Sequence, residues 1–180
     1  DGDGALTADD RTIIGNPHPD FIYGLNNNLS FKNFDLNIFI LGKKGGDIMN
    51  YTAMDLGLLN GRSNQSKDVV NRWTPSNTNT DIPSANIDRV FIVSDRWVED
   101  GSFLRLKNVS LGYTFKDINI EKFHLRSARI YISAQNLYTI TKYSGVDPEI
   151  AYSSSNKNIG LDYASYPNVK SFTAGLNIGF

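Results

Sequence analysis

The sequence contains no cysteine and only two histidines, His18 and His124. The lack of cysteine excludes a disulfide framework and any zinc site with cysteine ligands, and two histidines exclude a histidine-rich metal centre. The 18 lysines and arginines nearly balance the 19 aspartates and glutamates, which gives a formal net charge of -1. The chain therefore lacks the basic surface that nucleic-acid binding requires, and it has no basic cluster for an anionic membrane surface.

Long apolar runs are missing as well. No stretch approaches the ~20 apolar residues of a membrane-spanning helix. The chain opens Asp-Gly-Asp-Gly, without the basic start and apolar core of a signal peptide. Hydropathy alone would predict a soluble protein, but that prediction is unsafe, because transmembrane strands carry a much weaker hydropathy signal than helices.

The sequence instead places apolar and aromatic side chains at every second position, and aromatic residues make up 12% of it. A period of two is that of a β-strand, in which successive side chains point to opposite faces. The alternation predicts an all-β fold with strands over residues 20–31, 34–42, 102–115, 125–137 and 169–180. Between the second and third strands, Ser66 is expected to cap a short helix that reaches Trp73.

The connections between the predicted strands alternate between short and long. Transmembrane β-barrels combine short periplasmic turns with long extracellular loops, whereas loops of this length are uncommon in compact soluble domains. The central bands of the predicted apolar faces contain no lysine or arginine, each of which would cost roughly 2–4 kcal/mol against lipid. Together these features predict a segment of a transmembrane antiparallel β-barrel with long extracellular loops.

A specific resemblance appears between Ser94 and Tyr113, where the chain reads SDRWVEDGSFLRLKNVSLGY. This block is similar to the most recognisable block near the C-terminus of SusC/RagA transporters. Shorter blocks fit the same family in the same order: Ile14–Pro17, Pro19–Phe21, Arg72–Pro75, Ala134–Tyr138, Thr141–Gly145 and Asp147–Glu149. The resemblance covers essentially the whole chain.

The resemblance implies a barrel of 22 strands with an internal plug, of which this chain would supply the last five strands. Such transporters are TonB-dependent outer-membrane importers of glycans or peptides, and they work with a SusD-like surface lipoprotein. We expect the plug, the TonB box and a signal peptide to lie upstream of this chain. Because a bilayer does not tolerate open sheet edges, the implied partners are the remainder of the barrel, the lipid bilayer, the SusD-like lipoprotein and the TonB complex.

Two candidate sites lie at the ends of the chain. The acidic start resembles the tail of an EF-hand-like loop, in which Asp1, Asp3 and Asp10 would hold ligand positions for calcium. The first ligand of such a loop would precede Asp1, and a solvated acidic turn is the alternative. At the other end, Phe180 resembles the terminal aromatic residue that the barrel-assembly machinery reads. A simple aromatic girdle residue is the alternative for Phe180, and both roles are compatible.

Aromatic residues of the long loops are candidates for contact with cargo or with the SusD-like lid, because aromatic rings stack on sugars and anchor interfaces. The candidates are Trp73, Tyr51, Tyr143 and Tyr152, with Tyr163 and Tyr166 in the same loops. Packing within the loops is the alternative for each of them. Four cations are expected to pair with other barrel residues rather than to select cargo: Arg96, Arg105, Lys107 and Arg129.

An enzyme is not expected. Asp147 and Glu149 form a possible carboxylate pair, but their spacing in a loop rich in serine and asparagine is weak evidence. The sequence has no nucleophile elbow, phosphate-binding loop or dinucleotide motif. The main alternative to the transporter is a soluble, calcium-bound β-sandwich that binds carbohydrate, whose apolar faces would pack together in one core. A third hypothesis, a glycoside hydrolase fragment, requires a catalytic carboxylate.

Overall fold

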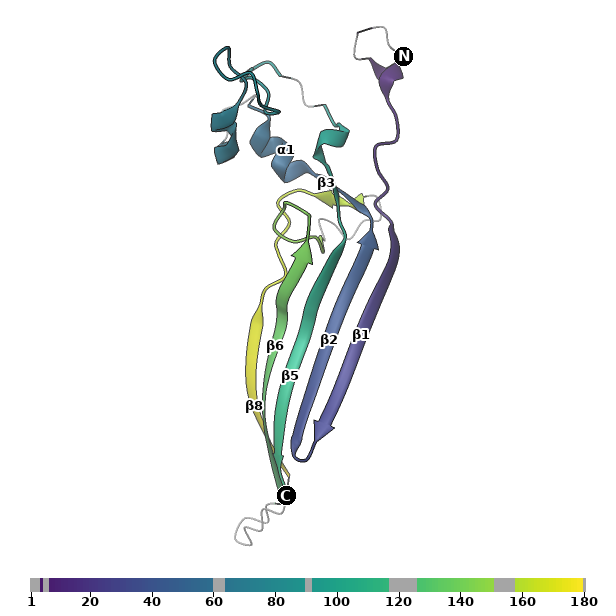
Figure 1. Cartoon of the computed structure of the whole chain (residues 1–180), viewed down its shortest axis with the longest axis vertical. Coiled ribbons are helices and arrows are strands. Elements are labelled where there is room, and N and C mark those ends of the chain that lie inside the picture. Colours follow the sequence, from purple (N-terminus) through teal and green to yellow (C-terminus); the bar gives the residue numbers. More distant parts are fainter. Residues whose placement is uncertain are drawn as a thin grey trace.

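Five long strands form one antiparallel sheet in the computed structural model of the chain (Figure 1). The structure describes residues 4, 7–59, 64–89, 92–116, 126–150 and 158–179. The strands stand in the order β1-β2-β5-β6-β8, and each neighbouring pair is antiparallel. Their bounds are β1 (Pro19–Phe31), β2 (Phe34–Gly45), β5 (Phe103–Phe115), β6 (Ser127–Thr141) and β8 (Ser171–Gly179). The predicted antiparallel β architecture is therefore present.

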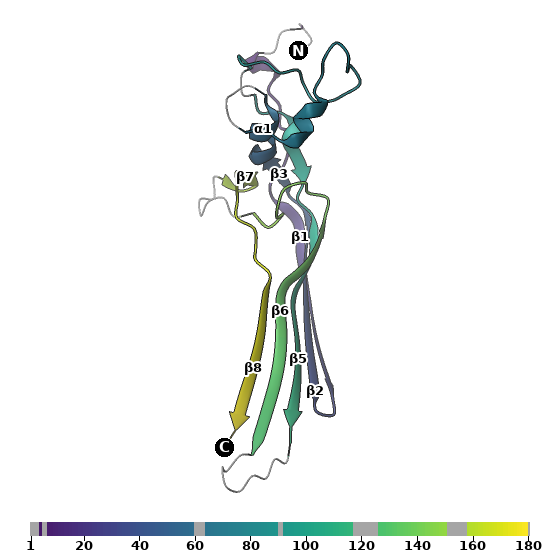
Figure 2. The same cartoon turned by 90° about the vertical axis from the view of Figure 1, so that its left-hand side faces the viewer.

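The strands of this sheet are long and uncovered. They contain between 9 and 15 residues, whereas a tilted strand needs about 9–11 residues to cross a bilayer. Figure 2 shows the sheet from its side as a single curved layer, and along most of its length no other described element covers either face. Both faces of the sheet are therefore open in this chain.

One face of the sheet is apolar, as the alternation predicts. Large apolar side chains from every strand of this sheet share this face and are exposed. Members of this apolar face are Phe21, Tyr23, Leu25, Leu29, Phe31, Phe34, Leu111, Ile130, Ile132, Tyr138, Ile140, Phe172, Leu176 and Ile178. A contiguous apolar surface of this size is not left in water by an ordinary soluble monomer.

The opposite face is polar, and its side chains bond across the strands. Asn37 of β2 donates through Nδ2 to Oδ1 of Asn26 at 2.8 Å and of Asn28 at 2.6 Å on β1. Asn108 of β5 in turn donates to Asn37 Oδ1 at 2.9 Å. Amide side chains are costly to place against hydrocarbon, which offers them no further hydrogen bonds. This polar face therefore suits a water-filled or protein-filled interior.

Near the hairpin turn, an ion pair spans three strands of the polar face. Arg129 of β6 contacts Asp35 of β2 through two hydrogen bonds, one of 3.0 Å from Nε and one of 2.5 Å from Nη2. Gly112 of β5 lies between them, and a Cβ at this position would collide with both side chains. The glycine therefore makes room for a charge pair between strands that are not neighbours.

A β-bulge changes which side chains of β5 face outward. By simple alternation, Arg105 would share the apolar face with Val109. The register with β2 and β6 shifts between Leu106 and Asn108, so that two residues of β5 oppose one residue of β2. As a result Leu106 pairs with Ile40 of the apolar face, and Arg105 points to the polar face. The bulge keeps a cation away from the apolar surface.

Short elements gather at one end of the long sheet, which we call the loop end (Figure 1). It contains a second sheet, in the order β4-β3-β7, and three helical elements. The strands are β3 (Asp47–Asn50), β4 (Val98–Asp100) and β7 (Leu161–Asp162), and the helical elements are α1 (Tyr51–Gly57), η2 (Lys67–Asn71) and η3 (Asp95–Trp97). A further short helix, η1, spans Ala8–Asp10. Among the described residues, no helix is long and apolar enough to cross a membrane.

Several boundaries differ from the predicted ones. β2 continues to Gly45 and β6 to Thr141, beyond the predicted ends at residues 42 and 137. In β6 the irregularity at Asn136, which has a positive φ of 50°, interrupts the alternation before Tyr138 and Ile140 resume it. Ser66 does cap a short helix, since its side chain accepts from Asp68 N, but this helix is of the 3-10 type and ends at Asn71.

Candidate functional site

The loop end has a small hydrophobic core of its own. Met49, Met54 and Leu58 are buried there, and Trp97 of η3 packs against them together with Leu161 of β7. The segments that meet in this core are far apart in the sequence. Burial of such side chains stabilises each by about 1.5–3 kcal/mol, so the hydrophobic effect gathers the loops into one defined structure.

Asn50 joins three of these segments by hydrogen bonds. It is the N-cap of α1, where its Oδ1 accepts from Ala53 N at 2.8 Å. Its Nδ2 donates to Glu99 Oε1 at 2.9 Å and to Ser144 Oγ at 3.3 Å. Ser144 also donates to Glu99 through its backbone N–H at 2.7 Å. Because Asn50 is only 2% exposed, loss of these partners would leave a buried amide unsatisfied.

Tyr143 and Asp162 form a second link, between the loop after β6 and β7. The hydroxyl of Tyr143 donates to Asp162 Oδ2 at 2.5 Å, and the ring is 5% exposed. Burial and this hydrogen bond raise the pKa of Tyr143 above its ordinary value. The phenol therefore stays neutral and acts as a donor over the whole physiological range.

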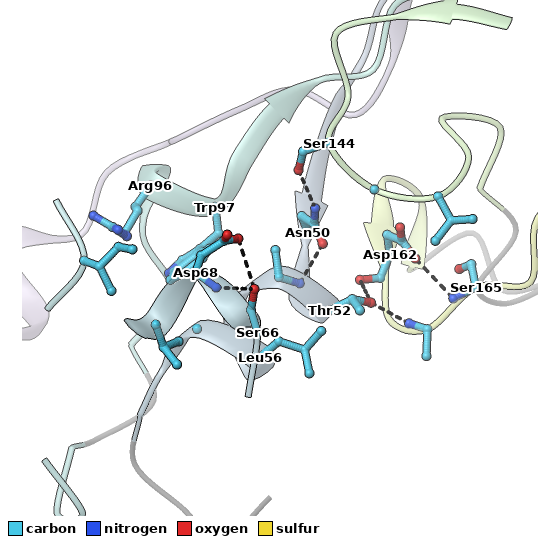
Figure 3. A pocket seen from close by; sticks show the side chains of 17 residues that line it. Asn50, Thr52, Leu56, Ser66, Asp68, Arg96, Trp97, Ser144, Asp162 and Ser165 are labelled. Atoms are coloured by element: carbon cyan, nitrogen blue, oxygen red, sulfur yellow. Dashed lines mark hydrogen bonds between the residues drawn. The ribbon is translucent and has the colours of Figure 1, made fainter. Parts of the chain in front are cut away.

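A cavity of about 710 Å³ lies among these segments (Figure 3). Figure 3 shows Asp68, Arg96 and Trp97 on one side of it and Asp162 and Ser165 on the other. The guanidinium of Arg96 stands 5.2 Å from the Trp97 ring centroid. Within the described part of the chain, Ser165 Oγ is buried without a hydrogen-bond partner. The remaining lining is Asn50, Thr52, Ala53, Leu56, Gly57, Ser66, Val69, Ile82, Ser144, Gly145, Val146 and Ala164.

A buried charge cluster fastens the loop after β6 to the polar face of the sheet. Arg105 is 2% exposed, and it donates to Asp147 at 2.5 Å and to Glu149 at 2.7 Å. Lys107 shares Glu149 at 3.0 Å. Asp147 also accepts from the backbone N–H of Asn168, just before β8, at 2.9 Å. Arg105 Nε also donates to Thr139 of β6 at 2.8 Å. These contacts tie β5 and β6 to the loop after β6 and to the segment before β8, and we call this point the Arg105 cluster.

The charge state of Asp147 follows from these contacts. Burial disfavours its carboxylate, but hydrogen bonds from Arg105 and from the backbone N–H groups of Glu149 and Asn168 outweigh burial. The pKa of Asp147 is therefore lowered, and the cluster is an ionised pair at neutral pH. Asp147 and Glu149 are both held in ion pairs with Arg105 and Lys107. This arrangement differs from that of a free catalytic carboxylate pair.

Similarity to known proteins extends along essentially the whole chain. The chain is 50% identical, over 185 residues, to TonB-dependent receptor P3 of Formosa agariphila, and the match covers 100% of the chain and 18% of that receptor. It is 28% identical, over 181 residues, to the TonB-dependent receptor SusC of Bacteroides thetaiotaomicron, with 99% of the chain and 17% of SusC covered. The solved structure of the RagAB peptide transporter superposes with a TM-score of 0.83 and 29% identity, over 98% of this chain and 19% of that one.

The chain is a segment of the SusC/RagA family of TonB-dependent receptors. It spans less than a fifth of the length of the curated relatives it matches. No family model matches it. The resemblance of the Ser94–Tyr113 block is thereby confirmed, and in this SusC/RagA segment the block provides η3, β4 and most of β5.

The predicted aromatic contact residues of the SusC/RagA segment do not share one site. Tyr143 is buried and bonded to Asp162, which is the packing role considered as its alternative. Trp73 is 43% exposed, and its backbone N–H donates to Ile82 O. Tyr51 begins α1 and lines a separate cavity beside Pro17 and Leu161. Tyr152 lies outside the described residues, so contact of these residues with cargo stays a prediction.

The terminal sites fall mostly outside the described part of the chain. This holds for Asp1, Asp3 and Phe180. Asp10 is described, and its Oδ2 accepts from Thr7 N at 2.7 Å, a hydrogen bond that lowers the pKa of Asp10. The described residues contain no group of three or more metal-ligating side chains. Calcium binding at this loop therefore stays a prediction.

The predicted pairing of cations is present for Arg105, Lys107 and Arg129, whereas Arg96 lies on the Trp97 ring. Trp97 itself was missed as a loop aromatic of interest. It connects the core of the loop end to the cavity wall. Its only signal in the sequence is its place in the family block between Arg96 and a short alternating run.

Proposed function

We propose that the chain forms five neighbouring strands in the wall of an outer-membrane β-barrel that imports nutrient molecules with energy from TonB. The observation that carries this proposal is the sheet itself, a single layer with one exposed apolar face and one polar face. The apolar face would contact lipid and the polar face would line the barrel interior. The SusC/RagA relatives, which are named as receptors and a transporter, support the same function.

Both edges of the sheet support completion by further strands. β1 and β8 each pair on one side only within the described residues. An unpaired edge in hydrocarbon would leave a row of N–H and C=O groups without partners, each costing several kcal/mol. In the proposed barrel, the remainder of the receptor pairs with both edges, and the barrel-assembly machinery reads Phe180 during insertion.

The loop end would then form part of the extracellular mouth. Its defined core and hydrogen-bond networks support a rigid rim rather than loose loops. We propose that this rim faces cargo and a SusD-like surface lipoprotein, and that the TonB complex engages a region upstream of this chain. The cargo class proposed is a glycan or a peptide. A RagAB relative is described as a peptide transporter, and that description applies to RagAB itself.

The carbohydrate-binding β-sandwich finds less support. A sandwich requires a second layer on the apolar face, and no described element provides one. The buried apolar residues lie at the loop end instead. The enzyme alternative gains nothing from the structure either, since Asp147 and Glu149 are engaged by Arg105 and Lys107.

Cysteine labelling tests the proposed topology, because the chain has no cysteine of its own. Ile132→Cys on the apolar face, Ser133→Cys on the polar face and Val146→Cys at the loop end are made in the full-length receptor. In whole cells, a membrane-impermeant maleimide should label Val146→Cys quickly and Ile132→Cys not at all, whereas a lipid-soluble maleimide should label Ile132→Cys. Equal labelling of Ile132→Cys and Val146→Cys by the impermeant reagent would contradict the barrel.

A further inference from the structure

One cation of the polar face lacks the partner that the others have. Arg105 and Lys107 contact Glu149, and Arg129 contacts Asp35. Lys43 stands on the same face, opposite Phe103 in the register of β2 and β5. Among the described residues, no hydrogen bond or ion pair involves Lys43. Its close contact is with the Phe103 ring, whose centroid lies 5.7 Å from Nζ, and Asp100 and Glu149 interact with it electrostatically from more than 4 Å away.

Lys43 borders a cavity of about 280 Å³ at the loop end. The walls are mainly apolar, with Pro17, Pro19, Ile22, Leu41, Ile48, Phe103, Pro148, Ile150 and Ile159. Two carboxylates also line it, and both are engaged elsewhere. Asp47 accepts from Asn16 N at 2.8 Å, and Glu149 accepts from Arg105 and Lys107. Neither lies within 4 Å of the Lys43 ammonium.

This setting favours an anion. An ammonium group has three donors and no acceptor, and partial burial among apolar walls removes part of the water that would otherwise satisfy them. The Phe103 ring compensates only in part, because a cation–π contact uses one side of the ammonium. Arg105 also stands over the same ring, 5.3 Å from its centroid to Cζ, but its charge is balanced by Asp147 and Glu149, so Lys43 is the cation available to a ligand.

We propose that Lys43 and the Phe103 cavity bind a carboxylate group of the imported molecule at the mouth of the barrel. This inference rests on the proposed function, which puts the polar face inside the barrel. Peptides and acidic sugars both carry carboxylates, so the shared chemistry is a carboxylate attached to a compact group that fits an apolar cavity. The cavity walls offer few other hydrogen-bonding side chains. The specific contact is therefore the one between the ligand carboxylate and the Lys43 ammonium.

Paired probes in the full-length receptor test this proposal. The first pair is trigalacturonic acid and its neutral analogue galactotriose, and the second is an N-acetylated pentapeptide with a free or an amidated C-terminus. Binding constants are measured by calorimetry for the wild type, Lys43→Gln and Lys44→Gln. Lys44 is the matched control, because it is the next residue of β2 and its side chain is exposed on the other face.

In at least one pair we expect the carboxylate to bind about tenfold or more tightly than its neutral twin. This preference should persist in Lys44→Gln and vanish in Lys43→Gln, and the pair that shows it identifies the source of the carboxylate. Absence of a preference in both pairs, or its survival in Lys43→Gln, would overturn the proposal.

Thermal unfolding of the cargo-free receptor tests the competing occupant, a carboxylate from another part of the same receptor. Equal unfolding temperatures for Lys43→Gln and Lys44→Gln are expected. A markedly lower temperature for Lys43→Gln alone would assign Lys43 to an internal ion pair and overturn the proposal. The labelling of Ile132→Cys is unaffected by all these outcomes, so failure here is distinguishable from failure of the barrel topology.

Discussion

The long sheet and the loop end of this SusC/RagA segment are built for different surroundings. The buried hydrophobic residues of the described chain are Ile48, Met49, Met54, Leu58 and Tyr143 of the loop end, together with Phe103, with which β5 begins beside it. The sheet, in contrast, exposes its apolar side chains, with Phe31 at 71% and Phe172 at 73%. The loop end therefore follows the rules of a water-soluble protein, and the sheet follows those of a protein in lipid.

The difference shows which forces hold each region together. At the loop end, apolar burial and buried polar networks act within the chain itself. In the sheet, backbone hydrogen bonds join the strands, and the favourable surroundings of the apolar face must come from outside the chain. Removing a charge should therefore destabilise the buried network of the loop end, whereas adding a charge should destabilise the apolar face of the sheet.

The largest effect is expected from Arg105→Ala. The substitution leaves the buried Asp147 carboxylate without its cation, and breaking a buried pair in this way costs about 3–5 kcal/mol. Denaturant midpoints and trypsin cleavage at the loop end of the full-length receptor measure the loss. Arg96→Ala is the control, because within the described part of the chain Arg96 makes only a cation–π contact, of about 0.5–1 kcal/mol. Equal stability of the two variants would show that the Arg105 cluster is not the fastening point.

Ile132→Arg tests the sheet side of the comparison. On the lipid face an arginine costs about 2–4 kcal/mol near the midplane, so the folded fraction in vesicles should fall. Ser133→Arg, one residue along β6, points to the polar face and should fold nearly as well as the wild type. The measurement is the gel shift between folded and heat-denatured receptor. A larger loss for Ser133→Arg would reverse the assignment of the two faces.

Gly112→Ala tests whether the glycine of the polar face is needed to make room for the Asp35–Arg129 pair. The new methyl group would displace the ends of the Asp35 and Arg129 side chains, and this mild overpacking should cost about 1 kcal/mol. The cost should shrink in an Arg129→Ala background, because the space is then open. Urea unfolding of the four variants forms a double-mutant cycle. Additive costs would show that the glycine serves a purpose other than room for the ion pair.

A pH dependence is expected at the loop end. Because the pKa of Asp147 is lowered in the folded state, its contribution is complete above the ordinary Asp pKa of about 3.9. The contribution is lost as pH falls further, through the lowered folded value, since the unfolded chain binds the proton first. Pepsin cleavage of the loop end should therefore increase at low pH in the wild type. The Arg105→Ala variant should show a weaker dependence.

The smallest effect is expected from Ser66→Ala, which removes the N-cap of η2. Its side chain accepts from Asp68 N at 3.3 Å, and a cap of this kind contributes about 0.5–2 kcal/mol. Trypsin cleavage at Lys67 should become faster, with the rest of the loop end unchanged. Lys67→Gln provides the control for the cleavage site. Loss of the whole loop end on this substitution would mean that η2 supports the core.

Much of the long sheet could be predicted from the sequence, because strand periodicity is a local signal. The alternation around Leu25 and Ile132 identifies both the strands and their apolar faces without any knowledge of pairing. The bulge at Lys107 could not be predicted in this way. Simple alternation places Arg105 on the apolar face of β5, whereas it lies on the polar face. Only its pairing with β2 and β6 reveals the shift.

The loop end could not be predicted in the same way. β3, β4 and β7 have 4, 3 and 2 residues, which is too short for a period to show, and they pair across wide sequence gaps. The partners of Arg105 were equally hidden, because Asp147 and Glu149 lie 42 and 44 residues away. Sequence identified the cation and the two carboxylates, and folding brought them together.

The Arg105 cluster also has a consequence for the order of folding. Arg105 and Asp147 are 42 residues apart, with the whole of β6 between them, and Asn168 follows Asp147 by 21 residues. Loop closure over such separations is slow compared with a local hairpin such as β1–β2. We therefore expect the cluster to form late, after the strands on either side of it have paired. A chain in which the cluster has closed is therefore expected to have β5, β6 and β8 already paired.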